Sequence, residues 1–134
     1  MPIHLPFDVV TPGLSFVIIG GSILVLIILT ILIALVEGVA LTLLGWDSFK
    51  RAYLVALLMN FISTCVGAVL LFILPQEQNL WWVLISFALS LLIEGLVLVR
   101  FKRRSARQNW TAALVANLAS YLILIAPIYF FGAG

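Results

Sequence analysis

The chain has few of the side chains that soluble enzymes use for chemistry. Its 134 residues include one cysteine, one histidine and only five acidic side chains. The single cysteine, Cys65, excludes an internal disulfide, and its place in an apolar run predicts that it packs in the core. The single histidine, His4, excludes a bis-histidine haem and argues against a zinc site. No histidine lies near the intramembrane serines to activate one as a nucleophile. The sequence therefore predicts no metal and no enzyme activity, and it indicates no particular cofactor.

Charge is also scarce, whereas apolar residues are abundant. Hydrophobic residues make up 65% of the sequence and charged residues 9%, while a soluble domain has roughly one half and one quarter. Backbone in lipid must pair its own polar groups, and the apolar runs are too long and too uniform for barrel strands. The predicted fold class is an all-α integral membrane protein with four transmembrane helices. The four runs lie at residues 14–44, 52–74, 81–101 and 110–131.

The first apolar run is unusually long for one crossing of the bilayer. It exceeds the typical ~20-residue span by about ten residues. Either Gly20-Gly21 interrupts the helix, or the helix tilts or extends beyond the lipid. The sequence leaves both explanations open.

The connections between the runs predict the orientation in the membrane. All seven Lys and Arg lie in or beside two connections, residues 45–51 and 102–108. Positive charge stays on the cytoplasmic side, so both loops are expected there, in a bacterial-type inner membrane. The Pro-rich arm at 1–13, the turn at 75–80 and the C-terminus then lie on the extracytoplasmic side. Trp46 is expected at the inner interface, as part of an aromatic belt.

Several polar residues recur at a fixed interval along the chain. Glu94-Gly95 follows Glu37-Gly38 by fifty-seven residues, and no gap is needed to align the two copies. Asn117 follows Asn60, and Ser120 follows Ser63, at the same interval. This pattern predicts two tandem helical hairpins, residues 14–74 and 81–134, in the same orientation and related by an axis along the membrane normal.

The recurring residues are expected to meet in one layer of the bundle. Counted from the helix ends at ~1.5 Å per residue, each Glu and Asn lies roughly 10–12 Å inside the cytoplasmic boundary. Small residues accompany them at helical spacing, so the polar face is also the face on which helices pack closely. The expected layer is Glu37, Asn60, Ser63, Glu94, Asn117 and Ser120.

Two roles for this layer are compatible with the sequence. In the first, each Glu is protonated and exchanges hydrogen bonds with an Asn amide, clamping the two helices of a hairpin together. In the second, Glu37 and Glu94 form a pair of proton- or cation-binding sites, with Asn60 and Asn117 as neutral co-ligands. Intramembrane acids are functional candidates by default, but a structural clamp explains the same residues.

The remaining features favour a protein that acts through contacts in the membrane. The expected partners are the lipid bilayer and other membrane subunits or further copies of the chain, and no nucleic acid. The sequence therefore favours a non-enzymatic accessory or scaffolding subunit of a larger membrane complex. The alternative is a small proton- or cation-coupled transporter or ion-conducting bundle that uses the paired Glu residues. Five basic residues are candidate contacts to lipid headgroups or to a partner: Arg100, Lys102, Arg103, Arg104 and Arg107.

Overall fold

The computed structural model describes residues 12–73, 80–102, 105–125 and 127. Most of the N-terminal arm, the outer turn and the pair Arg103-Arg104 lie outside this part of the chain. The described residues form helices and short connections, so the all-helical class is confirmed. The elements are α1 (Pro12–Leu43), α2 (Phe49–Ile73), α3 (Leu80–Phe101) and α4 (Ala106–Ser120), which continues as a π-helical turn, η1 (Tyr121–Ile125).

Three of the helices are long and apolar enough to cross a membrane. The candidate spans are Gly21–Leu43, Phe49–Leu70 and Leu84–Phe101. Many of their large apolar side chains face outward, which suits lipid and not water. This supports the expected membrane location. The described part of α4 is 15 residues long, shorter than a full crossing, so a fourth span remains a prediction.

Helix α1 is a single unbroken helix of 32 residues. It passes through Gly20-Gly21 without interruption, which excludes a helix break as the explanation for its length. Tilt or extension beyond the lipid remains as the explanation. It begins at Pro12, where a proline is tolerated because the first-turn N–H has no partner within the helix. At 1.5 Å per residue the helix is about 48 Å long, against about 30 Å for the hydrocarbon core.

The turn between α1 and α2 depends on one glycine. Gly45 has φ of +69°, a left-handed conformation that only glycine adopts without strain. Its N–H donates to Thr42 O at 2.9 Å, and the N–H of Trp46 donates to Leu41 O at 2.9 Å. This is the Schellman pattern, which satisfies the last carbonyls of a helix. The expected helix stop at Gly45 therefore has a direct physical cause.

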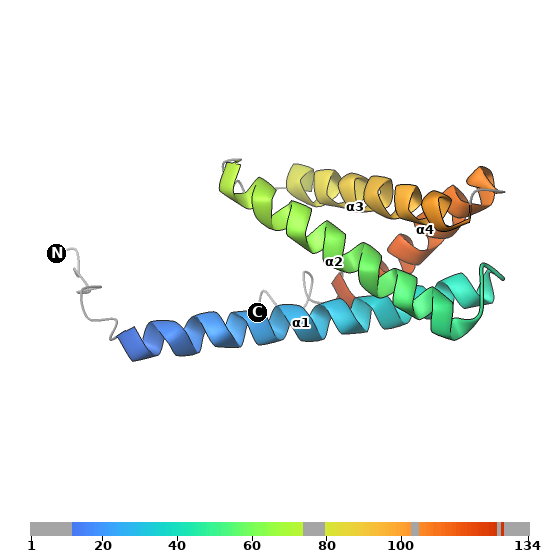
Figure 1. Ribbon diagram of the computed structural model, residues 1–134. Coiled ribbons are helices and arrows are strands. Elements are labelled where there is room, and N and C mark those ends of the chain that lie inside the picture. The colour runs from blue at the N-terminus through green and yellow to red at the C-terminus, as the bar shows by residue number, and fades with distance from the viewer. Residues whose placement is uncertain (1–11, 74–79, 103–104, 126, 128–134) are drawn as a thin grey trace.

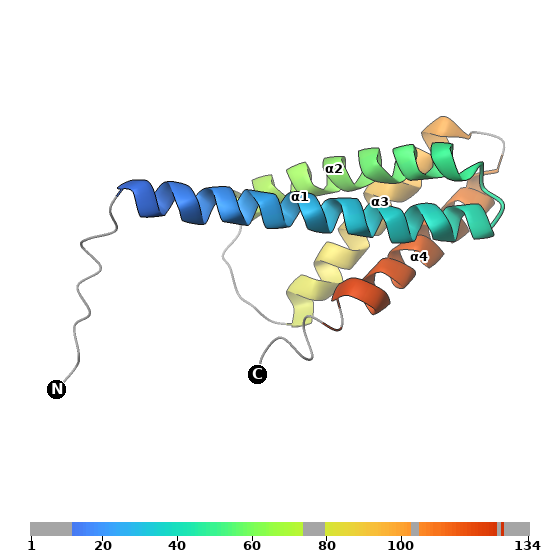
Figure 2. The same cartoon turned by 90° about the horizontal axis from the view of Figure 1, so that it is seen from below.

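The four helices pack as a ring in which each helix contacts two neighbours. Helix α1 packs on α2 and α4, and α3 packs on α4 and α2. The connections α1–α2 and α3–α4 lie at the same end of the bundle (Figure 1). Away from that end α1 and α2 diverge, and the first turns of α1 extend past the other helices (Figure 1, Figure 2). The bundle is therefore tightest near the two loops that carry the basic residues.

Small residues allow the helices of each hairpin to approach closely. A Cβ added to Gly38 would lie 3.0 Å from Tyr53 Cα on α2, and one added to Gly95 would overlap the ring of Trp110 on α4. In both cases the glycine follows the buried Glu, and the aromatic residue comes fifteen positions later. The buried apolar core around these contacts is rich in alanine: Ala34, Leu41, Trp46, Ala52, Val55, Ala56, Met59, Leu98, Ala112, Ala113 and Ala116.

A hydrogen-bond network joins the two loops at the tight end of the bundle. The indole Nε1 of Trp46 donates to Asn109 Oδ1 at 2.8 Å, and Asn109 Nδ2 donates to the carbonyl of Lys102 at 2.6 Å. The ammonium of Lys102 donates to the Trp46 carbonyl and lies 5.3 Å from the centre of its ring. Trp46 is only 1% exposed, so its ring packs inside the bundle and is not presented to lipid headgroups, while its depth in the membrane remains a prediction.

Cys65 is also placed differently from the expectation. The sequence predicted core packing, but the side chain is exposed on α2. It lies five positions after Asn60, so the helix turns it away from the polar face that contains Asn60 and Ser63.

Candidate functional site

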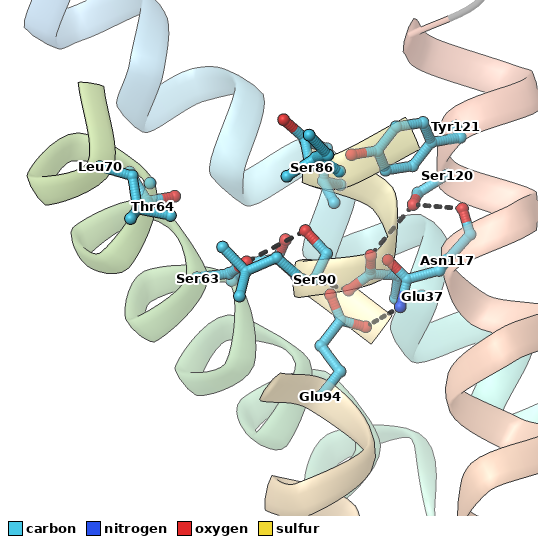
Figure 3. Close-up of a pocket in the computed structure, with 15 residues that line it drawn as sticks. Glu37, Ser63, Thr64, Leu70, Ser86, Ser90, Glu94, Asn117, Ser120 and Tyr121 are labelled. Atoms are coloured by element: carbon cyan, nitrogen blue, oxygen red, sulfur yellow. Dashed lines mark hydrogen bonds between the residues drawn. The ribbon is translucent and has the colours of Figure 1, made fainter. Parts of the chain in front are cut away.

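A cavity of about 290 Å³ lies between the helices of the bundle. All six residues expected in the polar layer line it, and side chains from different helices point into the same space (Figure 3). Two thirds of its lining residues are polar, which is unusual for the interior of a bundle that faces lipid. The polar lining consists of Glu37, Asn60, Ser63, Thr64, Ser86, Ser90, Glu94, Asn117, Ser120 and Tyr121.

The first carboxylate is held by the neighbouring helix of its own hairpin. Asn60 Nδ2 on α2 donates to Glu37 Oε2 on α1 at 2.5 Å. The same amide nitrogen donates to Ala56 O, one turn earlier on α2, at 2.9 Å. Both amide hydrogens are therefore used, and the second bond fixes the side-chain orientation that presents the first.

The second carboxylate is held in the same way. Asn117 Nδ2 on α4 donates to Glu94 Oε2 on α3, and also to Ala113 O at 3.1 Å. In both pairs the amide follows the acid by twenty-three residues and bonds to a backbone carbonyl four residues earlier. Two contacts that are equivalent in sequence are thus equivalent in geometry.

Serine hydroxyls connect one hairpin to the other. Ser120 Oγ on α4 donates to Glu37 Oε1 on α1 at 3.0 Å. Ser63 on α2 and Ser90 on α3 lie 3.1 Å apart through their hydroxyl oxygens. Although Ser63 and Ser120 recur at the same interval as the Glu and Asn residues, their partners differ. The two halves of the cavity therefore differ in their serine hydrogen bonds, although the serines recur at a fixed interval in the sequence.

Both carboxyl groups are removed from solvent. Glu37 and Glu94 are each 1% exposed, and they are close enough for their charges to interact. Two negative charges that are buried together repel each other strongly where the dielectric constant is low. The arrangement is stable when a proton or another positive charge is present between them. Chemically, the cavity is suited to holding a positive charge.

Four polar lining residues were missed by sequence reasoning, although a helical signal was available. Thr64 follows Asn60 by four residues, Ser90 precedes Glu94 by four, and Tyr121 follows Asn117 by four. Residues four apart share a helix face, so extending each face by one turn would have found them. Ser86 lies one turn before Ser90 on the same face. The ring of Tyr121 packs edge-on against Phe87 with 5.1 Å between ring centres.

The basic residues do not form a single surface. Arg100 and Arg107 are exposed, as a contact to lipid headgroups requires. Lys102 is turned inward to Trp46 and takes part in the loop network. Arg103 and Arg104 lie outside the described residues.

Comparison with protein-family models, with curated proteins and with solved structures found no match.

Proposed function

We propose that the chain is a four-span protein of the bacterial inner membrane, built from two copies of one helical hairpin. The matched Glu–Asn bonds and the matched glycine–aromatic contacts support the duplication. The gathering of both basic loops at one end supports an orientation with that end in the cytoplasm. Cysteines introduced at Ser105 and Gly134 test the topology. The first should be labelled only from the cytoplasm and the second only from outside, and labelling both from the same side would contradict it.

Within this architecture, we propose a non-enzymatic accessory or scaffolding subunit of a larger membrane assembly. The observation that carries this proposal is the length of α1. Even at a tilt of about 40°, the upper end of the usual range, a 48 Å helix extends about 37 Å along the bilayer normal. Its first turns therefore project beyond about 30 Å of hydrocarbon, although their sequence is apolar.

The part of α1 away from the loops is also not covered by the other described helices. Every residue from Gly21 to Ile28 is exposed, so the helix is open around its whole circumference there. Lipid can cover the part inside the bilayer, but apolar residues beyond it need a protein surface. The partner is another membrane subunit or a second copy of this chain.

Purification in a mild detergent, followed by native mass measurement, tests this function. The expected result is a complex larger than one chain. Leu24→Ser, in the part of α1 that the other described helices leave uncovered, should reduce partner recovery, whereas Val69→Ser, at an equally exposed position on α2, should not. A monodisperse monomer would contradict the proposal, as would equal recovery of the partner with both variants.

The cavity favours a second candidate function, a small proton- or cation-coupled transporter or ion-conducting bundle. The supporting observation is that both carboxylates line one cavity to which all four helices contribute residues. Replacing both with glutamine preserves size and hydrogen bonding but removes the charge. In proteoliposomes, the double variant Glu37→Gln with Glu94→Gln should fold normally and lose ion flux. If the unmutated protein carries no proton or cation flux, the transport function is eliminated.

A further inference from the structure

The two carboxyl groups in the cavity are not equally satisfied. Glu37 accepts hydrogen bonds at both oxygens, from Asn60 at Oε2 and from Ser120 at Oε1. Glu94 accepts one from Asn117 at Oε2. Among the residues that the structure describes, no donor reaches Glu94 Oε1. The serine at the position that corresponds to Ser120 is Ser63, and its hydroxyl pairs with Ser90 instead.

This difference leaves one carboxylate oxygen inside the cavity available to a ligand. Glu94 is 1% exposed and lines the cavity, and in Figure 3 its side chain points into the space shared with Glu37 and Ser90. No buried side-chain nitrogen or oxygen atom of the described residues lacks a hydrogen-bond partner, so Glu94 Oε1 has no donor because it faces the open space of the cavity. A carboxylate oxygen in that position is stabilised when water, a proton or a cation in the cavity meets it. Glu37, with a donor on each oxygen, does not have this requirement.

The other groups around the space indicate the class of ligand. Hydroxyl oxygens of Ser63, Ser90 and Tyr121 line the same cavity, and oxygen donors of this kind suit hard cations. The described residues contain no group of three or more His, Cys, Asp or Glu that would hold a metal ion. A single available carboxylate fits one positive charge better than two. About 290 Å³ is enough for a cation with several waters, each occupying about 30 Å³.

We propose that the cavity binds one monovalent cation, with the Glu94 carboxylate as its charged ligand and Glu37 as a structural member of the wall. The shared chemistry is a single positive charge, which an alkali-metal ion or a small protonated amine supplies. This inference concerns the same cavity as the second candidate function. It does not depend on transport, because a cation can bind without crossing the membrane.

Thermal unfolding of the purified full chain in detergent tests the proposal. Sodium, potassium, ammonium and methylammonium chlorides are compared with N-methylglucamine chloride, whose cation is too large to enter, at equal ionic strength. At about a hundredfold excess over Kd, the bound cation should raise Tm by roughly 5–10 °C. A response to alkali ions or to amines identifies the source of the charge. If none of the small cations raises Tm more than N-methylglucamine does, the proposal is wrong.

Glutamine variants distinguish the two carboxylates. Glu94→Gln keeps an acceptor for Asn117 but removes the charge, so the Tm response should be lost. Glu37→Gln should retain more than half of the response, since the side-chain amide oxygen of the variant can still accept from Asn60. Asp47→Asn, which removes an acid paired with Arg51 in the loop, should retain all of it. An undiminished response in Glu94→Gln would overturn the assignment.

A measurement on the unmutated protein covers the case in which Glu94→Gln does not fold. A hydrophobic carbodiimide reaches carboxyl groups within the bilayer, and peptide mass measurement locates the adduct. The adduct should form at Glu94, and the effective cation should slow its formation. Preferential modification of Glu37, or no protection by any small cation, would overturn the assignment. Cation binding without flux would eliminate only the transport function, so the two failures are distinguishable.

Discussion

The close approach of α1 and α2 at Gly38 leads to a prediction whose size follows from the structure. In Gly38→Ala, the new methyl group would lie 3.0 Å from the Cα and 3.3 Å from the backbone N of Tyr53. Backbone atoms cannot rotate away, so α1 and α2 must separate. Overpacking of this kind costs about 1–3 kcal/mol. Because Glu37 is the preceding residue, the separation also strains its bond to Asn60.

A second glycine of the same helix provides the control. A Cβ added to Gly21 meets nothing within 4 Å. Both substitutions replace Gly by Ala inside α1, so the helix-propensity gain of about 1 kcal/mol applies to both and cancels in the comparison. Unfolding of the purified protein by SDS titration, followed by tryptophan fluorescence, should therefore show Gly38→Ala less stable than Gly21→Ala by about 1–3 kcal/mol. Equal stability of the two variants would refute the close contact.

Two further predictions concern aromatic contacts at the loop end. Gly95→Ala should destabilise the bundle because the added Cβ would overlap the Trp110 ring. Adding Trp110→Ala should restore most of the lost stability. If the effects of the two substitutions on stability are simply additive, the contact is contradicted. Asn109→Ala should cost about 1–3 kcal/mol in the same titration, because the buried indole N–H of Trp46 loses its acceptor. The neighbouring Gln108 is exposed, so Gln108→Ala should change stability by less than about 0.5 kcal/mol, and a similar loss in both variants would count against the network.

The sequence was sufficient to anticipate the helices and six of the residues that line the cavity. Apolar runs of this length leave few alternatives to helices in a membrane. Glu37 and Asn60 were expected at one depth because they lie at similar distances from the same turn, and the structure brings them within hydrogen-bonding distance. The same reasoning applied to Glu94 and Asn117. The number of residues between each side chain and the turn can be counted in the sequence, so these pairings could be predicted.

Contacts that depend on how helices rotate against each other could not be predicted in this way. The sequence does not determine that Ser120 bonds to Glu37 while Ser63 bonds to Ser90, because both choices lie at the same depth. The burial of Trp46 was missed for a related reason. An aromatic residue beside a loop is usually interfacial, but here Asn109 supplies a buried acceptor from the opposite hairpin.

The positions at which the two proposed hairpin copies differ are where the bundle acquires its specific features. Most corresponding positions are alike in burial, as with Leu41 and Leu98 or Ala56 and Ala113. Ala52, however, corresponds to Asn109, and this one change creates the acceptor that joins the two loops.

The same comparison explains the open carboxylate. Ile33 on α1 corresponds to Ser90 on α3. The hydroxyl at position 90 pairs with Ser63, and Ser63 then makes no bond to Glu94. Two identical hairpins would satisfy both carboxylates equally or neither. Under the proposed duplication and the proposed cation site, the difference at position 90 would account for one structural clamp and one binding site. Ser90→Ile should therefore free Ser63 to donate to Glu94 and should weaken the Tm response to cations. An unchanged Tm response would show that the free oxygen of Glu94 is not what binds the cation.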